Sequence, residues 1–199
     1  MISLGIDLSL TGTGVVVLEN GKVVEEKLIK SKPCGDTPLD ELHRIRAIVS
    51  QIRDIVVKYN PVIERSLIES RPRPAFVIVN IENLAFAIRK TSSLTQLSGL
   101  NYLVRAMLDD LKIHFILTAP TTLKKYICKG NVKKDVVMLE VYKKYGLTFS
   151  DNNLCDAFVL SAIASALVEK PIEKEHTKQQ REVLKLLSKQ IDNILIYQE

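Results

Sequence analysis

Residues 1–18 read MISLGIDLSLTGTGVVVL, and this stretch decides the fold class of the chain. Hydrophobic side chains alternate with small or polar ones up to Asp7, which is typical of a β-strand over residues 2–7. A Thr-Gly-Thr-Gly turn follows, and a run of aliphatic residues then predicts a second strand. The pair Asn20-Gly21 is a strong hairpin signal, so we expect a third strand over residues 23–29. The chain should therefore open with three antiparallel strands.

The remaining segments predict helices mixed with two further strands. Thr37, Pro38 and Asp40 resemble a capping box, so a helix should start there and end near Asn60-Pro61. We expect a short fourth strand over 66–69, a helix over 91–111, a fifth strand over 114–117, and helices over 121–127, 133–145 and 153–168. The stretch 71–90 gives no clear pattern. This order predicts an α/β protein with a mixed five-stranded sheet flanked by helices, which is the RNase H-like arrangement.

The length and composition are those of one globular domain followed by an extension. With 199 residues, 46% of them hydrophobic, the chain can bury a core without disulfides or metal ions. We expect the compact domain over residues 1–168 and a C-terminal helical extension over 169–199. Within that extension, residues at three- to four-residue steps are hydrophobic, which predicts an amphipathic helix: Leu184, Leu187, Ile191 and Ile194. This helix should pack either on the body of the domain or on a partner.

Several classes of protein are disfavoured by the sequence. The longest strongly apolar stretch, residues 158–168, is well short of the roughly 18 apolar residues that a membrane span needs. The N-terminus lacks the basic start and long apolar run of a secretory signal. The three cysteines form no metal-ligand spacing, which favours reduced thiols. These features predict an intracellular, cytoplasmic protein without a membrane partner.

The positive charge is concentrated in one segment. The net charge is +5, and between Pro120 and Lys144 only Asp135 and Glu140 oppose seven lysines, namely Lys124, Lys125, Lys129, Lys133, Lys134, Lys143 and Lys144. Clustered lysines around a glycine-containing loop are suited to the phosphate backbone of a nucleic acid. The alternative is an ordinary solvated face of a surface helix.

Three carboxylates are candidates for catalysis. Asp7 ends the first predicted strand, Glu69 ends the predicted fourth strand, and Asp156 lies early in the last core helix. In this strand order, the first and fourth strands are neighbours, so these carboxylates should converge at one crevice. Such a group would bind magnesium, which prefers oxygen ligands. Each acid also has a simpler explanation. Asp7 could accept hydrogen bonds from the backbone of the turn, and Glu69 could be a surface acid at a strand end. Asp156 could interact favourably with the dipole at the N-terminus of its helix.

The motifs resemble those of RuvC-type crossover junction endonucleases, which are Holliday junction resolvases of the RNase H-like superfamily. The matching segments are GIDLSLTGTG at 5–14, LIE at 67–69, TQLSGL at 95–100, PTTLKK at 120–125 followed by Lys129-Gly130 and Lys133, and Asp156-Ala157. The resemblance implies a homodimer that binds four-way or branched DNA in recombination and repair. It also implies symmetric nicking with two Mg²⁺ ions per site, for which Mn²⁺ can substitute.

Two positions depart from the family pattern. Asn153 stands where the family has a further Asp or His, so it would be a neutral fourth ligand, with Asp151 as its rival. Pro72 stands where the family often has an aromatic residue, although Arg71 and Arg73 flank it as candidate DNA contacts. These departures leave the fourth metal ligand and the contacts at the junction centre open.

Other functions remain as alternatives. A sugar kinase or actin-like ATPase also begins with a Gly-Ile-Asp strand, but it needs two such domains, for which this chain is too short. Another RNase H-like nuclease, acting on RNA/DNA hybrids or on flaps, is a nearer alternative. A DNA-binding module with weakened catalysis is the third, and Asn153 gives it some support.

Overall fold

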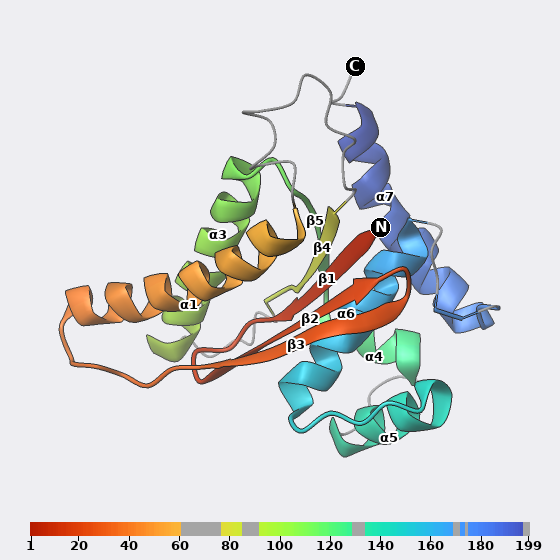
Figure 1. Cartoon of the computed structure of the whole chain (residues 1–199), viewed down its shortest axis with the longest axis horizontal. Helices are drawn as coiled ribbons and strands as arrows, with labels where there is room; N and C mark the ends of the chain where they lie inside the picture. The colour runs from red at the N-terminus through yellow and green to blue at the C-terminus, as the bar shows by residue number, and fades with distance from the viewer. Residues whose placement is uncertain (61–76, 85–91, 129–133, 169–171, 174, 197–199) are drawn as a thin grey trace.

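The computed structural model describes residues 1–60, 77–84, 92–128, 134–168, 172–173 and 175–196. Its centre is a five-stranded sheet in the order β3-β2-β1-β4-β5 (Figure 1). The strands are β1 (Ile2–Asp7), β2 (Gly12–Glu19), β3 (Lys22–Lys30), β4 (Val77–Glu82) and β5 (His114–Thr118). The first three are antiparallel to one another, and β4 and β5 run parallel to β1. The predicted fold class, a mixed five-stranded sheet flanked by helices, is confirmed.

The hairpin between β2 and β3 follows from local chemistry. Asn20 and Gly21 have φ angles of 50° and 79°. A two-residue turn of this kind needs positive φ at both central positions, and asparagine and glycine tolerate this better than other residues. The turn therefore forms where the Asn-Gly pair predicts it.

The strand beside β1 is not the one predicted at 66–69. It is β4, which pairs with β1 in parallel from Ile2 opposite Val77 to Ile6 opposite Ile81. A central parallel strand is covered on both faces and so forms a nearly continuous apolar run. Asn80 interrupts that run in the sequence, but its side chain is fully buried and hydrogen-bonded, which is why the apolar pattern understated this strand. The predicted strand and Glu69 lie outside the described residues.

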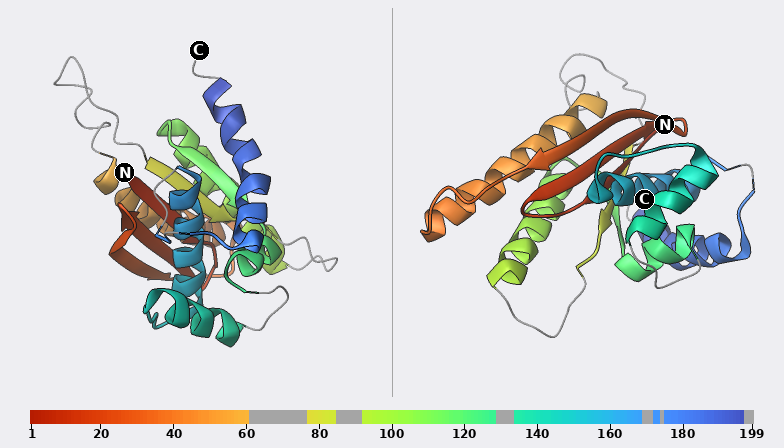
Figure 2. Two further views of the ribbon diagram at one scale, coloured as in Figure 1. Left: turned by 90° about the vertical axis from the view of Figure 1, so that its right-hand side faces the viewer. Right: turned by 90° about the horizontal axis from the view of Figure 1, so that it is seen from below.

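Helices cover both faces of the sheet. One face carries α1 (Pro38–Tyr59) and α3 (Ser92–Asp110), and the other carries α6 (Asn152–Leu167) with α4 (Pro120–Ile127) and α5 (Lys134–Tyr145) (Figure 2). The capping box of α1 is confirmed: the Thr37 side chain accepts a hydrogen bond from the Asp40 N–H, and the Asp40 side chain accepts one from the Thr37 N–H. No helix in the described ranges is long and apolar enough to cross a membrane.

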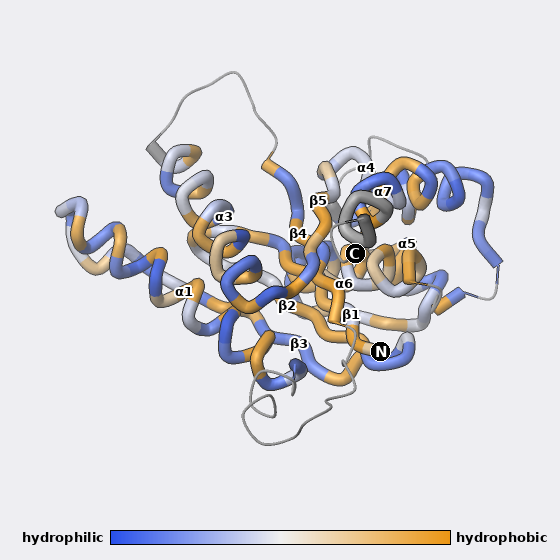
Figure 3. Tube along the Cα trace, turned by 90° about the horizontal axis from the view of Figure 1, so that it is seen from above, coloured by the Kyte–Doolittle hydropathy of each residue, from blue (hydrophilic) through white to orange (hydrophobic). Residues whose placement is uncertain are grey.

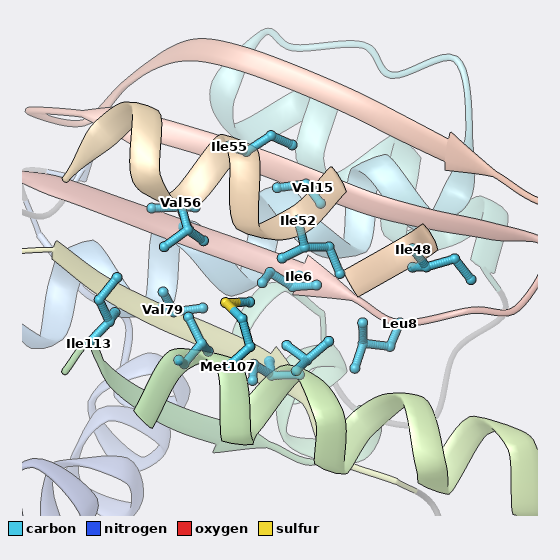
Figure 4. Close-up of a cluster of buried hydrophobic side chains, with 14 of the residues drawn as sticks. Ile6, Leu8, Val15, Ile48, Ile52, Ile55, Val56, Val79, Met107 and Ile113 are labelled. Atoms are coloured by element: carbon cyan, nitrogen blue, oxygen red, sulfur yellow. The ribbon is translucent and has the colours of Figure 1, made fainter. Parts of the chain in front are cut away.

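Two hydrophobic cores follow from the alternation of side chains along the strands. On one face, Ile6 and Val79 pack against Ile52 of α1 and Met107 of α3 (Figure 4). On the other face, alternate strand residues pack against α6, whose hydrophobic residues extend around the whole helix. Figure 3 shows this difference: the central strands and α6 are largely hydrophobic, whereas hydrophobic and hydrophilic residues alternate along α1. Because α6 is buried on all sides, its position relative to the sheet is strongly constrained.

The C-terminal helix α7 (Lys178–Ile196) packs on the body of the domain. Val183 and Leu187 are buried in the core around α6. The Gln190 side-chain amide donates to the Leu117 carbonyl and accepts from the Leu117 N–H, each at 2.9 Å. Leu117 is in β5, the outermost strand of the described sheet, so Gln190 takes the place of a neighbouring strand at that edge. Of the two expected locations for this helix, the structure shows the body of the domain.

Glu173 joins the extension to α4 and α5. Its side chain is 7% exposed and forms an ion pair with Lys144 at 2.9 Å. It also accepts hydrogen bonds from the hydroxyls of Tyr126 and Tyr145 and from the Gln180 amide. Burial tends to raise the pKa of Glu173, but the hydrogen bonds from Lys144 and Tyr145 outweigh it and hold the pKa below its usual value.

Glu173→Gln is expected to lower the stability of the folded chain by about 2 kcal/mol at neutral pH, because it removes a charged acceptor from a buried network. Since the folded-state pKa lies below the unfolded one, the carboxylate stabilises the fold above the unfolded pKa. This contribution is lost as the pH falls through the folded-state pKa. Thermal unfolding of both proteins between pH 3 and 7 should show the two curves converging at the acidic end.

Glu182→Gln is the matched control for this experiment. Glu182 forms an ion pair with Lys125 at 2.9 Å, but both side chains are nearly half exposed. Exposed pairs contribute little to stability, so the unfolding temperature of this variant should stay close to that of the parent. Equal losses in the two variants would show that burial of Glu173 is unimportant.

Candidate active site

Two carboxylates end adjacent parallel strands. Asp7 is the last residue of β1 and Glu82 is the last residue of β4. Ile6 is opposite Ile81 in the parallel register, so the next residue of each strand is Asp7 and Glu82. Neighbouring strands lie about 4.8 Å apart, which brings these two residues to the same edge of the sheet.

Both carboxylates belong to the face of the sheet that α6 covers. Side chains alternate between the faces, so Glu82 shares a face with Asn80, and Asp7 shares one with Gly5. The Asn80 amide donates to the Leu160 carbonyl of α6 at 2.9 Å. A Cβ atom on Gly5 would overlap the backbone of Ala157, also in α6. Asp7 is 5% exposed and Glu82 is half-buried, so the pair lies at the rim of the contact between sheet and helix.

The start of α6 lies over this edge. Asp151 is the N-cap, and its side chain accepts a hydrogen bond from the Asn153 N–H at 2.8 Å. The Asn153 amide donates to the Gly12 carbonyl at 2.5 Å. Gly14 is paired with Asp7, and a Cβ atom on Gly14 would overlap the backbone of Asn153. The half-buried Asp156 lies in the helical turn between these two contacts of α6, over Gly14 and Gly5, so the structure brings Asp7, Asn153 and Asp156 to one corner of the fold.

The turn between β1 and β2 is held rigidly beside this corner. The Thr13 hydroxyl donates to the Ser9 carbonyl at 2.7 Å and accepts from the Ser9 N–H at 3.1 Å. The Leu10 carbonyl accepts hydrogen bonds from Arg44 of α1 and from the Ser31 hydroxyl, each at 2.6 Å. These bonds satisfy the polar groups of the turn and fix where β1 ends at Asp7.

Glu82 is a candidate site residue that the sequence patterns do not single out. Ile81 precedes it directly and residues 77–79 form an aliphatic run just before Asn80, which is the signal that the sequence offers. The polar Asn80 obscured that signal. In the structure, the Asn80 amide oxygen accepts a hydrogen bond from the Thr118 hydroxyl at 2.8 Å, so β4, β5 and α6 are linked by one buried network.

The oxygen donors at this edge are suited chemically to magnesium. Asp7, Glu82 and Asp156 offer carboxylates. Asn153 offers its amide oxygen, because its amide nitrogen donates the hydrogen bond to the Gly12 carbonyl. One oxygen of Asp151 is already used to cap α6, which favours Asn153 over Asp151 as a further ligand. In the described part of the chain, no three His, Cys, Asp or Glu side chains are gathered closely enough to hold a metal ion.

The lysine-rich segment is partly neutralised within the protein. Lys125 of α4 is paired with Glu182, Lys143 with Glu140, and Lys144 with Glu173. Lys124 lies in α4 and Lys134 begins α5. The other candidate DNA contacts, Lys129, Lys133, Arg71 and Arg73, lie outside the described residues. Within the described residues, three of these lysines therefore have carboxylate partners that a phosphate would have to displace.

The two buried cysteines near this site are unsuited to nucleophilic catalysis. Burial, together with the neighbouring Asp156 and Cys128, raises the pKa of Cys155 to about 12. Burial and nearby Glu140 likewise raise the pKa of Cys128. Both thiols are therefore protonated at neutral pH.

Comparisons with known proteins identify the fold. No family model and no curated protein matches this sequence. A structure of Thermus thermophilus RuvC in complex with a Holliday junction substrate matches with a TM-score of 0.62 and 17% identity, over 85% of this chain and 97% of that one. A second Thermus thermophilus RuvC structure matches with a TM-score of 0.61 and 19% identity, over 85% and 98% of the two chains. The sheet with helices on both faces thus has the fold of RuvC, as the short sequence motifs predict.

Proposed function

We propose that this protein is a metal-dependent endonuclease that resolves four-way DNA junctions. The observation that carries the proposal is the placement of Asp7 and Glu82 at the ends of adjacent parallel strands, with Asp156 in the turn of α6 that lies over Gly5 and Gly14. The RuvC fold supports it, since one of the matching structures contains a Holliday junction substrate. The proposal replaces Glu69 with Glu82 as the second carboxylate of the site.

In the proposed site, Asp7, Glu82, Asp156 and Asn153 hold magnesium. Divalent cations bound there would supply activation of the attacking water and stabilisation of the leaving oxygen of a phosphodiester. Two of the donors have defined positions in the folded chain: Asp7 is nearly buried, and the Asn153 amide donates a hydrogen bond to the Gly12 carbonyl. The N-terminal end of α6 also carries a partial positive charge beside the edge where a phosphate would bind.

The basic residues would hold the substrate backbone. Lys124, Lys129, Lys133, Lys134, Arg71 and Arg73 are the proposed phosphate contacts, and Lys125 would join them on leaving Glu182. A homodimer would present two sites to a four-way junction and nick two opposing strands symmetrically. Phosphate contacts of this kind make binding strongly dependent on salt.

Asp7→Asn is expected to abolish magnesium-dependent cleavage while leaving junction binding unchanged or tighter. The substitution removes a metal ligand, and it also removes a negative charge near the phosphates. Cleavage of labelled synthetic junctions and electrophoretic binding assays would measure the two effects separately. A variant that cuts junctions as fast as the parent would contradict the proposed site.

A panel of substrates separates the related functions. The parent should cut four-way junctions in preference to flaps, duplex DNA and RNA/DNA hybrids. Preference for a hybrid or a flap would identify another RNase H-like nuclease with the same carboxylates. Junction binding without cleavage would favour the weakened DNA-binding module, for which the neutral Asn153 is the supporting observation.

A further inference from the structure

Asn101 interrupts the hydrophobic face of α3. The neighbouring residues on that face, Leu97, Val104 and Leu108, pack into the core. Asn101 is fully buried among them. Its amide nitrogen donates to the Glu82 carbonyl at 3.3 Å, and its amide oxygen is buried without a hydrogen-bond partner in the part of the chain described.

Stability alone does not account for an asparagine at this position. A buried amide oxygen without a donor is unfavourable, and an apolar residue of similar size removes that penalty. Leucine would match the hydrophobic stripe formed by Leu97, Val104 and Leu108, but it would leave the Glu82 carbonyl without the Asn101 donor. The hydrogen bond that Asn101 makes goes to the last residue of β4, which is the candidate ligand Glu82.

The last residue of β4 lies beyond the paired part of β1 and β4. The parallel pairing of β1 and β4 stops at Ile6 opposite Ile81, one residue before Glu82. On the opposite side, the Asn83 N–H donates to the Thr118 carbonyl of β5 at 2.8 Å. The backbone of Glu82 is thus held between β5 and the side chain of Asn101.

We propose that Asn101 is a positioning residue, which sets the location of the Glu82 carboxylate relative to Asp7 by holding the Glu82 carbonyl. This inference rests on the proposed nuclease function. Groups that orient metal ligands from behind typically change metal affinity or activity by about 10- to 100-fold when removed. Asn101 would act in this way from the opposite face of the sheet to α6.

Asn101→Leu tests the proposal, with Val104→Ala as the matched control on the same helix. Calorimetric titration with Mn²⁺ in the absence of DNA gives metal affinity, and thermal unfolding gives stability. We expect Asn101→Leu to unfold near the temperature of the parent, because removal of the unpaired amide oxygen offsets loss of the donor to the Glu82 carbonyl, and to bind Mn²⁺ about tenfold more weakly. The magnesium concentration for half-maximal junction cleavage should rise by the same factor.

Val104→Ala should show the opposite combination. Val104 is fully buried in α3, so the cavity should lower the unfolding temperature, while Mn²⁺ affinity stays at the parent value. Asn101→Ser, whose hydroxyl is too short to reach Glu82, should weaken Mn²⁺ binding like Asn101→Leu and serves if the leucine variant does not fold.

The results separate the two proposals. Parent-like Mn²⁺ affinity in the folded Asn101 variants would overturn the positioning role while leaving the nuclease function standing. A parent protein that neither binds Mn²⁺ nor cuts any substrate would overturn the nuclease function and, with it, the role of Asn101. Weakened binding in Asn101→Leu with unchanged binding in Val104→Ala would support both.

Discussion

Glu82→Gln is expected to reduce magnesium-dependent junction cleavage by more than about 100-fold. Loss of a metal ligand should have a larger effect than loss of a residue that only orients a ligand. The carboxylate ends β4 beside Asp7, and glutamine keeps the shape of the side chain while removing its charge. Folding should be preserved, since Glu82 is half-buried at the rim of the sheet. Single-turnover cleavage of a labelled junction over a range of magnesium concentrations would measure the loss.

Glu69→Gln is the matched control for this prediction. Both residues are glutamates that follow aliphatic residues, but the strand that pairs with β1 ends at Glu82. The Glu69 variant should therefore retain cleavage close to that of the parent. The reverse result, with Glu69→Gln inactive and Glu82→Gln active, would show that the end of β4 does not supply the second ligand.

Gly14→Ala is expected to destabilise the protein and to displace α6 from the site. A Cβ atom on Gly14 would overlap the main chain of Asn153, which cannot move away as a flexible side chain can. Overpacking of this kind costs about 3 kcal/mol, which should lower the unfolding temperature by roughly 10 °C in a chain of this length. Asp156 and Asn153 would shift together, and a displacement of about 1 Å at a reacting centre can cost about 100-fold in rate.

Gly99→Ala controls for the general effect of replacing a glycine. A Cβ atom on Gly99, in α3, would meet only Ile45 Cδ1 at the ordinary distance of 3.8 Å. Alanine is favoured over glycine within a helix by about 0.5–1 kcal/mol, so this variant should be slightly more stable than the parent. Thermal unfolding and cleavage rates of the two variants can be compared directly. A stable, active Gly14→Ala variant would show that close approach of α6 is not required for the site.

The C-terminal extension contributes both to the fold and to the charge of the proposed DNA-binding region. The structural match includes almost all of each RuvC chain but leaves 15% of this chain unmatched. In this chain, Gln190 of α7 closes the edge of β5, and Glu182 pairs with Lys125 of α4. Removal of the extension would therefore change sheet stability and available positive charge together, which is why point substitutions are the better test.

Local sequence determined those features that depend on a few neighbouring residues. The Asn20-Gly21 turn forms because both residues tolerate positive φ, and α1 begins at Thr37 because the capping box satisfies N–H groups that the helix cannot. The position of Asp7 at the end of β1 could be predicted from the alternating strand before it and the Gly-containing turn after it. The order of elements was enough to predict the mixed sheet, since few topologies accommodate that order.

Tertiary structure alone decided which residues share the site. Glu82 could be chosen over Glu69 only by knowing which segment pairs with β1, and that pairing joins residues about 75 positions apart. The bond from Asn153 to Gly12, the ion pair between Lys125 and Glu182, and the docking of α7 on β5 are likewise contacts between distant segments. Periodicity indicates that a residue is buried or exposed, but not which distant backbone it meets, so the proposed carboxylate partner of Asp7 emerged only from the folded chain.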